Sequence, residues 1–266
     1  MTTEWTSVLG RVSFVNCDPL YHQLDSEWGI LPAPPAWLTG HLLRKDCLTA
    51  PIPAADYARY SDELLLLPDI GISSRGAVGS VLLFGERELE NVRDIAVPTD
   101  SSTSRQLLRY LLAGQGLDPR TVEMGPDLDL MLDRCDAALL IGDRALDEAN
   151  NRPEMILMDL GTEWQQRNSV PMVFGVFAVR KDAPIQQVRR AHRMLSAQVN
   201  LFESNQQRRE AVISETALRT GFSTERLRLY FQEVRNVMGP AEILGLRTFL
   251  TEVCKFEGRP LFIELA

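Results

Sequence analysis

The sequence predicts an α/β protein built as two lobes with a ligand site between them. Strand and helix signals alternate through most of the chain, as they do in α/β folds. Two strongly apolar, β-prone runs at 78–84 and 173–180 bracket a self-contained middle unit. Residues 184–256 carry helical signals throughout. Such a chain crosses from one lobe to the other, returns, and ends in helices packed on the first lobe.

The two bracketing strands set the expected boundaries of the lobes. We expect hinge crossings near 84–87 and 174–178, so the chain passes between the lobes twice. A ligand of such a fold binds between the lobes, at strand ends and helix N-termini. The predicted division is lobe one, residues 1–86 and 178–266, and lobe two, residues 87–177.

The first lobe opens with a predicted strand at 12–15, a short apolar run that stops at Asn16-Cys17-Asp18-Pro19. The pattern after it predicts a short helix at 20–24, an irregular Pro-rich stretch at 30–37, a helical turn at 38–43, a buried strand at 48–52, a helix at 56–60, and an apolar run at 64–67 that leads into 70–76.

The second lobe begins with a predicted strand at 94–97, after which Asp100 and the hydroxyl residues 101–104 open a helix. Apolar residues spaced along one face of this helix mark it as amphipathic, and Gly114 ends it. The segments expected after it are a helix at 127–133, a buried strand at 137–141, a short strand at 155–160, and the terminal helices, with breaks near Gly221 and Gly239-Pro240.

Composition excludes several classes of function. The formal net charge of −8 argues against a nucleic-acid or anionic-membrane partner. The four cysteines are far apart, so we expect reduced thiols and no metal site. Residues 1–5 lack the basic and apolar regions of a signal peptide, and no window of the sequence approaches a transmembrane span. We therefore expect a cytoplasmic protein, and the sequence does not predict its oligomeric state.

Two features are candidates for ligand binding. Asn16 ends the first strand, where an open α/β sheet places its ligands, but an Asn before Asp-Pro is also a common turn residue. Residues 101–104 are four consecutive hydroxyl residues at a helix start, which suit a carboxylate. One of them would suffice for a plain N-cap, so both interpretations stay open.

Other polar groups have simpler explanations. Gly142-Asp143 ends a buried strand, and Asp143 fits the N-cap of the next helix better than an acid in the cleft. Residues 73–76 fit a solvated turn better than a carboxylate-binding arginine site. No phosphate-binding loop, nucleophile elbow or histidine triad is present in the sequence, so we expect no metal and no organic cofactor.

Several segments, in order and at similar spacing, resemble the chorismate dehydratases of the futalosine route to menaquinone. They cover residues 10–182 and include the stretches 10–21, 67–84, 101–104, 136–143, 159–164 and 171–182. The resemblance implies a periplasmic-binding-protein-like (type II) fold used as an enzyme. It also implies loss of water from chorismate to give an enolpyruvyl-oxy benzoate.

The resemblance also assigns residues. Asn16 matches the family's strand-end Asn beside the substrate ring, and Thr103 and Ser104 match its helix-start hydroxyls. The predicted site therefore has Asn16 as the catalytic residue and six substrate-binding residues: Ser80, Ser101, Thr103, Ser104, Gly142 and Asp143. The second crossing departs from the usual Thr-Gly-Leu-Pro-Phe pattern and closing Trp, with Met172 and Phe177 affecting the expected pocket shape.

The implied reaction removes one ring proton and a neighbouring hydroxyl. One hypothesis is that a substrate carboxylate takes the proton while Asn16 positions the carboxylate or the hydroxyl; a protein base, Asp18 or Asp143, is the alternative. Two rival functions remain. One is a non-catalytic binding or sensing protein for a small aromatic or carboxylic acid. The other is a sister futalosine-pathway enzyme of the same fold.

Overall fold

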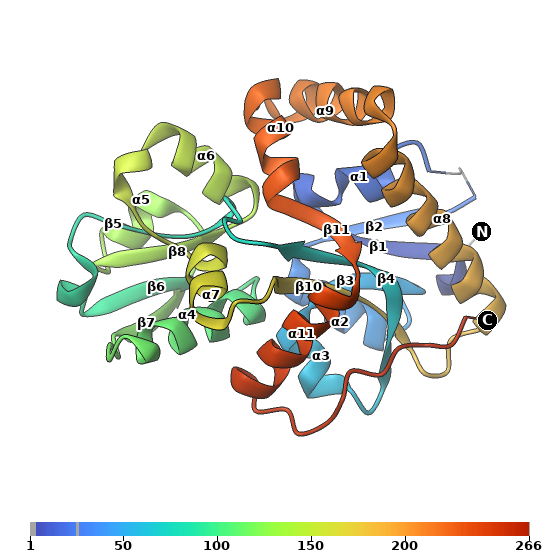
Figure 1. Ribbon diagram of the computed structural model, residues 1–266, viewed down its shortest axis with the longest axis horizontal. Coiled ribbons are helices and arrows are strands. Elements are labelled where there is room, and N and C mark those ends of the chain that lie inside the picture. The colour runs from blue at the N-terminus through green and yellow to red at the C-terminus, as the bar shows by residue number, and fades with distance from the viewer. Residues whose placement is uncertain (1–3, 25–26, 266) are drawn as a thin grey trace.

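The computed structural model describes residues 4–24 and 27–265, so part of the N-terminal segment used above, residues 1–3, lies outside it. The chain forms two lobes side by side, each built on one sheet (Figure 1). Lobe one has the strand order β11-β4-β10-β3-β1-β2, with β1 (Val8–Val12), β2 (Gly29–Ala33), β3 (Thr49–Pro53), β4 (Leu64–Ser74), β10 (Met172–Arg180) and β11 (Val234–Met238).

Lobe two is built on a five-stranded sheet with the order β7-β6-β8-β5-β9. Its strands are β5 (Val81–Gly85), β6 (Asp94–Pro98), β7 (Arg120–Met124), β8 (Ala137–Ile141) and β9 (Ile156–Asp159). Strands β6, β7 and β8 are parallel, whereas β5 is antiparallel to β8 and β9. The carboxyl ends of β6 and β8 therefore lie at one edge of the sheet.

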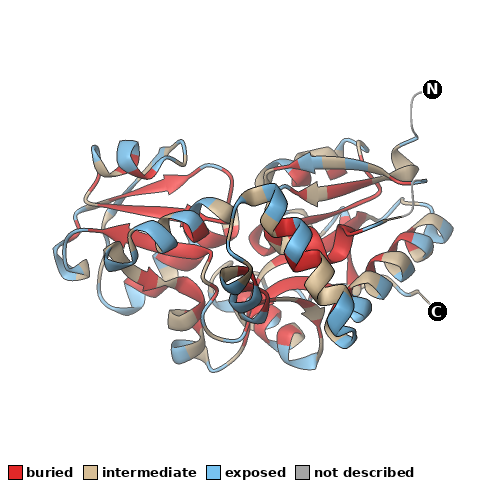
Figure 2. Cartoon of the chain, turned by 90° about the horizontal axis from the view of Figure 1, so that it is seen from above, coloured by how far each residue is buried: buried red, intermediate tan, exposed pale blue. Residues whose placement is uncertain are grey.

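Helices cover the faces of both sheets, and the sheets form the buried interior (Figure 2). Lobe one carries α1 (Asp18–Tyr21), α2 (Pro35–Leu43), α3 (Ala54–Tyr60), α8 (Ile185–Ser204), α9 (Gln206–Thr220), α10 (Thr224–Glu233) and α11 (Pro240–Glu252). Lobe two carries α4 (Ser102–Gly114), α5 (Leu128–Leu132), α6 (Asp143–Asn151) and α7 (Leu160–Asn168). Short 3-10 helices are η1 (Trp5–Ser7), η2 (Val15–Cys17), η3 (Leu89–Asn91) and η4 (Pro153–Met155).

The predicted apolar face of α4 is confirmed. Its four buried leucines are Leu107, Leu108, Leu111 and Leu112. Burial of each contributes about 1.5–3 kcal/mol, which anchors the helix on its sheet. This anchoring fixes where the N-terminus of α4 lies. Within the described residues, each helix is too short or too polar to cross a bilayer.

The crossings lie earlier than the sequence indicated. The sequence pattern predicts the run 78–84 in lobe one, but β5 pairs with β8 and β9 in lobe two. Likewise β10 lies wholly in the lobe-one sheet, between β3 and β4. The chain therefore changes sheets at 75–80 and 169–171, before each apolar strand rather than within or after it. Apolar patterning reveals that a strand is buried but not which sheet buries it.

Three strands escaped prediction because each lies at a sheet edge or is short and polar. β2 contains Pro32, which an edge strand tolerates because its free side needs no donor. β7 is the polar, mostly exposed edge of lobe two. β11 is a five-residue edge strand inside the region assigned to helices. The first strand also ends earlier than predicted, at Val12, and residues 15–17 form η2.

Candidate active site

A cleft between the lobes encloses about 550 Å³ of empty space, part of it open to solvent. Its walls are mainly apolar and come from both sheets and the first crossing. The polar side chains on the walls are Asn16, Ser80, Ser101 and Ser104. An apolar pocket with a few convergent polar groups is the usual form of a small-molecule site. Four of the predicted residues, together with the backbone of Gly142, thus line one cleft.

Asn16 lies on η2, just beyond the carboxyl end of β1. Asn236 of β11 holds its backbone by donating from Nδ2 to the carbonyl of Asn16 over 3.1 Å and to that of Gly71 over 3.4 Å. The side-chain Oδ1 of Asn16 is buried and has no hydrogen-bond partner among the described residues. A buried acceptor without a partner is costly, so this oxygen is available to a ligand.

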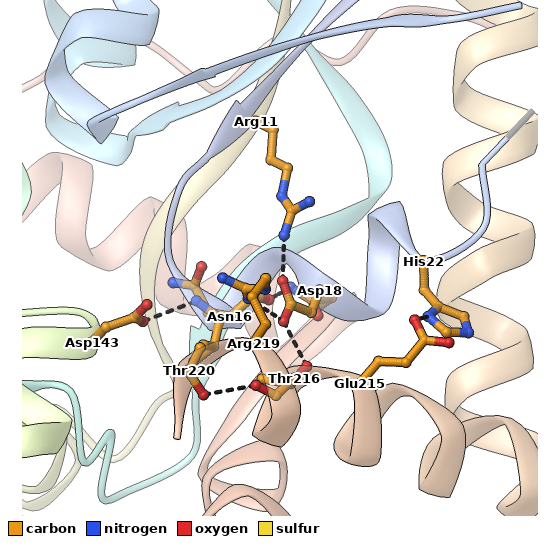
Figure 3. A network of polar contacts seen from close by, with 11 residues as sticks. Arg11, Asn16, Asp18, His22, Asp143, Glu215, Thr216, Arg219 and Thr220 are labelled. Carbon is orange, nitrogen blue, oxygen red and sulfur yellow. Dashed lines mark hydrogen bonds and ion pairs between the residues drawn. The ribbon is translucent and has the colours of Figure 1, made fainter. Parts of the chain in front are cut away.

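Asp18 anchors the segment that carries Asn16 (Figure 3). Its Oδ1 pairs with Arg11, and its Oδ2 accepts from Thr216 over 2.6 Å and from Arg219 over 2.5 Å. Because both oxygens are bonded and the residue is absent from the cleft walls, the geometry does not support Asp18 as the base. Its contacts instead join α1 to β1 and α9.

Asp143 reaches from α6 toward the Asn16 segment (Figure 3). Its Oδ1 accepts from the backbone N–H of Val15 over 2.9 Å. Burial raises the pKa of Asp143 to about 6, and the negative charge of Asp18 adds to this effect. The Val15 N–H and two nearby arginines oppose the rise in the pKa. Asp143 does not line the cleft, so it is placed behind the wall that Gly142 forms.

Gly142 is required by its surroundings. Its φ of 63° and ψ of −144° are reached by glycine and hardly by other residues. A Cβ here would lie 2.5 Å from the ring of Phe14, which also lines the cleft. The Gly142 N–H donates to the carbonyl of Ser80 over 2.8 Å. Gly142 therefore shapes the cleft by letting the two lobes approach closely.

The start of α4 uses its hydroxyls in two ways. The Oγ of Ser101 caps the helix by accepting from the Ser104 N–H over 3.2 Å, and the two side chains share a 2.8 Å hydrogen bond. Both line the cleft. The prediction of a plain N-cap is confirmed for Ser101. The hydroxyl of Ser104 is not needed for the cap.

Thr103 faces away from the cleft. Its Oγ1 accepts from the backbone N–H of Ala55 over 3.1 Å, and Ser102 donates to Asp56 over 2.6 Å. These bonds join the N-termini of α3 and α4 across the two lobes, and we call the four residues the interlobe latch. The expectation that Thr103 lines the pocket is wrong, because its side chain lies on the face of α4 that meets α3.

Ser80 lies at the end of the first crossing and lines the cleft. Its Oγ is hydrogen-bonded to the hydroxyl of Tyr230 at 3.0 Å. Asp159 fixes the backbone just before it by accepting from the N–H groups of Val78 and Gly79. At the second crossing, Phe174 lines the cleft, while Met172 and Phe177 are fully buried away from it.

The remaining chemistry of the cleft is sparse. All four cysteines are free, and burial raises the pKa of Cys17, beside Asn16, to about 12, so this thiol stays protonated. Residues 4–24 and 27–265 hold no group of three or more His, Cys, Asp or Glu side chains arranged for a metal ion. The arrangement supplies hydrogen bonds and an apolar enclosure.

Sequence reasoning missed the contribution of residues 206–238. Thr216, Arg219, Tyr230 and Asn236 all contact the segments that carry Asn16 or Ser80. Their contacts span more than 140 residues, and the family resemblance did not extend to this region. The alternating burial of β11 was the one local signal, and it was hidden between helices.

Comparison with known proteins agrees with this geometry. A family described as menaquinone biosynthesis matches residues 7–255. The chorismate dehydratase of Thermus thermophilus is 34% identical over 263 residues, which is 91% of this chain and 93% of that protein. The chain belongs to the menaquinone biosynthesis family. The resemblance found in the sequence is thereby confirmed.

Solved structures show the fold of this menaquinone biosynthesis family member. A protein of Archaeoglobus fulgidus has a TM-score of 0.71 at 19% identity, covering 92% of this chain and 95% of that one. A Candida albicans protein described as having the generic periplasmic binding protein fold has a TM-score of 0.68 at 11% identity, covering 97% of each chain. The alkanesulfonate-binding protein of Xanthomonas axonopodis pv. citri reaches 0.65 at 14%, covering 96% and 95%. The predicted periplasmic-binding-protein-like fold is confirmed.

Proposed function

We propose that this protein is a chorismate dehydratase. It eliminates water from chorismate to give 3-[(1-carboxyvinyl)oxy]benzoate in menaquinone biosynthesis by the futalosine route. The 34% identity to the Thermus thermophilus enzyme and the family match support this substrate. The structural observation that carries the proposal is the buried Oδ1 of Asn16 in the interlobe cleft, which has no hydrogen-bond partner among residues 4–24 and 27–265.

The cleft suits an elimination. One ring C–H bond and one C–O bond break, the proton and the hydroxide leave as water, and the electron pair of the C–H bond completes an aromatic ring. Aromaticity supplies the driving force, so the enzyme must chiefly orient the substrate and exclude solvent. The group that takes the ring proton passes it to the departing hydroxyl, which leaves as water. Before the C–O bond breaks, Asn16 Oδ1 accepts from that hydroxyl and so fixes its direction relative to the ring. The apolar walls exclude water from the reacting face.

Two proton acceptors remain after the contacts of Asp18 are accounted for. A carboxylate of the substrate lies inside the cleft by necessity, whereas Asp143 is set behind Gly142 and does not line it. We therefore propose the substrate carboxylate as the base, with Asp143 holding the Val15 N–H. The raised pKa of Asp143 makes it the competing acceptor, which a substitution can distinguish.

The remaining parts of the proposal follow from this chemistry. The enzyme is a carbon–oxygen lyase of the hydro-lyase type, and its partner is a small molecule. The donors in the cleft are hydroxyl and amide groups, which suit an elimination without an organic cofactor. We propose that it acts in the cytoplasm, and that Ser80, Ser101 and Ser104, which line the cleft, contact the substrate carboxylates.

Incubation of purified protein with chorismate tests the proposal. We expect a product lighter by one water and with the ultraviolet spectrum of a substituted benzoate, formed also after treatment with a chelator. Tight binding of chorismate without turnover would favour a binding or sensing protein, as the fold allows. A folded sample that neither binds nor converts chorismate would reject the assignment and turn attention to later intermediates of the same route.

A further inference from the structure

One face of α10 lies against the first crossing. Arg226, Tyr230 and Glu233 lie at i, i+4 and i+7 on this helix, and Arg226 pairs with Glu233 over 3.0 Å. Arg226 also contacts the carbonyl of Gly79 at 3.5 Å. Gly79 has a φ of 62°, and a Cβ there would meet the ends of both charged side chains within 2.5 Å. The crossing that ends in Ser80 is therefore held tightly against α10.

The hydroxyl of Tyr230 is buried with no solvent exposure, as is the rest of its side chain. Within the described residues it has one hydrogen-bond partner, Ser80 Oγ at 3.0 Å. Burial also raises the pKa of Tyr230 well above its ordinary value, so the phenol keeps its proton. That proton needs an acceptor, because a buried unpaired donor is destabilising.

The two possible polarities of this bond differ in where they leave a free proton. If Ser80 donated, the Tyr230 proton would have no acceptor among its neighbours in the core. If Tyr230 donates, the proton left over is that of Ser80, whose side chain lines the cleft. A ligand can accept the Ser80 proton, whereas the described residues offer the Tyr230 proton no hydrogen-bond partner other than Ser80. A phenol is also a stronger donor and a weaker acceptor than an aliphatic hydroxyl.

We propose that Tyr230 is a positioning residue that points the Ser80 hydroxyl proton into the cleft, toward a carboxylate oxygen of the ligand. The proposal rests on the proposed function for the identity of that ligand, chorismate. The polarity of the Tyr230–Ser80 bond does not depend on the ligand. The carboxylate that Ser80 contacts is the one that does not take the ring proton. Its charge is the same in the ground state and the transition state, so Ser80 acts on binding.

Kinetics of four proteins test the coupling: wild type, Y230F, S80A and the double variant. We expect S80A to raise KM for chorismate about tenfold and Y230F about threefold, with little change in kcat. The double variant should match S80A, because Tyr230 acts through Ser80. Independent, multiplying effects on KM, or a fall in kcat for Y230F alone, would overturn the proposal.

Y57F is the matched control. Tyr57 is also fully buried, and its hydroxyl accepts from the Leu261 N–H over 2.7 Å, away from the cleft. We expect Y57F to lower Tm without raising KM. If Y57F raised KM as much as Y230F, loss of any buried tyrosine hydroxyl would explain the effect and the proposal would fail.

Nuclear magnetic resonance tests the polarity even if wild type does not convert chorismate. In protein with labelled tyrosines, the Tyr230 hydroxyl proton should exchange slowly and show a nuclear Overhauser effect to its own ring. This signal should vanish in Y230F and shift in S80A. No such signal in wild type would show that Tyr230 does not donate and would reject the proposal. Absent turnover with the signal present would reject the proposed function alone.

Discussion

The two sides of the cleft meet the ligand with opposite arrangements. On the lobe-one side, Asn236 holds the backbone of Asn16, while the side-chain oxygen of Asn16 has no hydrogen-bond partner in the part of the chain that the structure describes. On the lobe-two side, the hydroxyls of Ser101, Ser102 and Thr103 are already bonded to protein groups. Most of this richer cluster thus serves capping and lobe closure, and Ser104 is its member left for a ligand, whereas the single amide of Asn16 is free to act. A buried polar atom without a hydrogen-bond partner therefore indicates a functional site better than a cluster of polar residues that bond to one another.

The Asn16→Ala substitution removes the free amide on the lobe-one side of the cleft and has the largest expected effect on activity. Loss of the amide that orients the leaving hydroxyl should lower kcat about 100-fold. Stability should change little, because Oδ1 makes no hydrogen bond to any described residue. The measurement is the steady-state rate of chorismate turnover together with Tm.

The control for this change is Asn150→Ala, an exposed asparagine of α6. It should keep full activity. An N16A enzyme with the kcat of wild type would remove Asn16 from the mechanism, whichever group acts as the base.

Asp143 connects the two sides of the cleft, since it belongs to lobe two and accepts a hydrogen bond from the segment that carries Asn16. Its pKa of about 6 in the folded protein lies above the unfolded value, so the folded state binds the proton more tightly. Wild type therefore loses stability as pH rises from about 4 through about 6, by an amount on the order of 3 kcal/mol. D143N keeps an acceptor for Val15 and has no carboxyl to ionise, so it should be the more stable protein at pH 7 and should lose this advantage near pH 4.

The same variant distinguishes the two bases. With the substrate carboxylate as base, D143N retains most of its kcat. With Asp143 as base, kcat would fall about 100-fold or more, and wild-type activity would decline below pH 6. Urea unfolding at several pH values and a pH–rate profile measure the two effects separately.

Much of the fold was predictable because it depends on local sequence patterns. The apolar face of α4, the glycine break after α9 and the Gly-Pro start of α11 each depend on a few adjacent residues. The crossings were misplaced because sheet membership depends on partners: β5 pairs with β8 and β9, which lie more than 50 residues away. Edge strands such as β7 lack the buried face that makes a strand visible in sequence.

The candidate site divides in the same way. Asn16, Ser80 and Ser104 line the cleft as the sequence indicated, and their roles stay a prediction. Thr103 could not be placed, because the face of α4 that meets α3 is fixed by how the lobes close. Tyr230 could not be found at all, since a buried tyrosine is indistinguishable in sequence from one that fills a core.

Thr103→Val removes one of the hydrogen bonds that occupy the hydroxyls on the lobe-two side of the cleft. Valine has the shape of threonine without the acceptor, so the buried Ala55 N–H loses its partner and the free energy of unfolding should fall by about 1–2 kcal/mol. Thr103→Ser keeps the hydroxyl and should restore most of the loss. A T103V protein of unchanged Tm and raised KM would place Thr103 in direct contact with substrate, against the observed geometry.

Ser101 and Ser104 give the smallest and finest contrast, because they share one hydrogen bond but differ in what else they do. Ser101→Ala removes the cap of α4 and should cost about 1 kcal/mol of stability. Ser104→Ala leaves the cap acceptor in place, since Ser101 accepts from the backbone of residue 104. Ser104→Ala should therefore cost less stability than S101A. It should also raise KM more, because the Ser104 hydroxyl is not needed for the cap and is available to a substrate carboxylate. Chemical denaturation and KM for chorismate, measured on both variants, give the two rankings. If S101A had both the lower stability and the higher KM, the start of α4 would contribute to binding only through its cap.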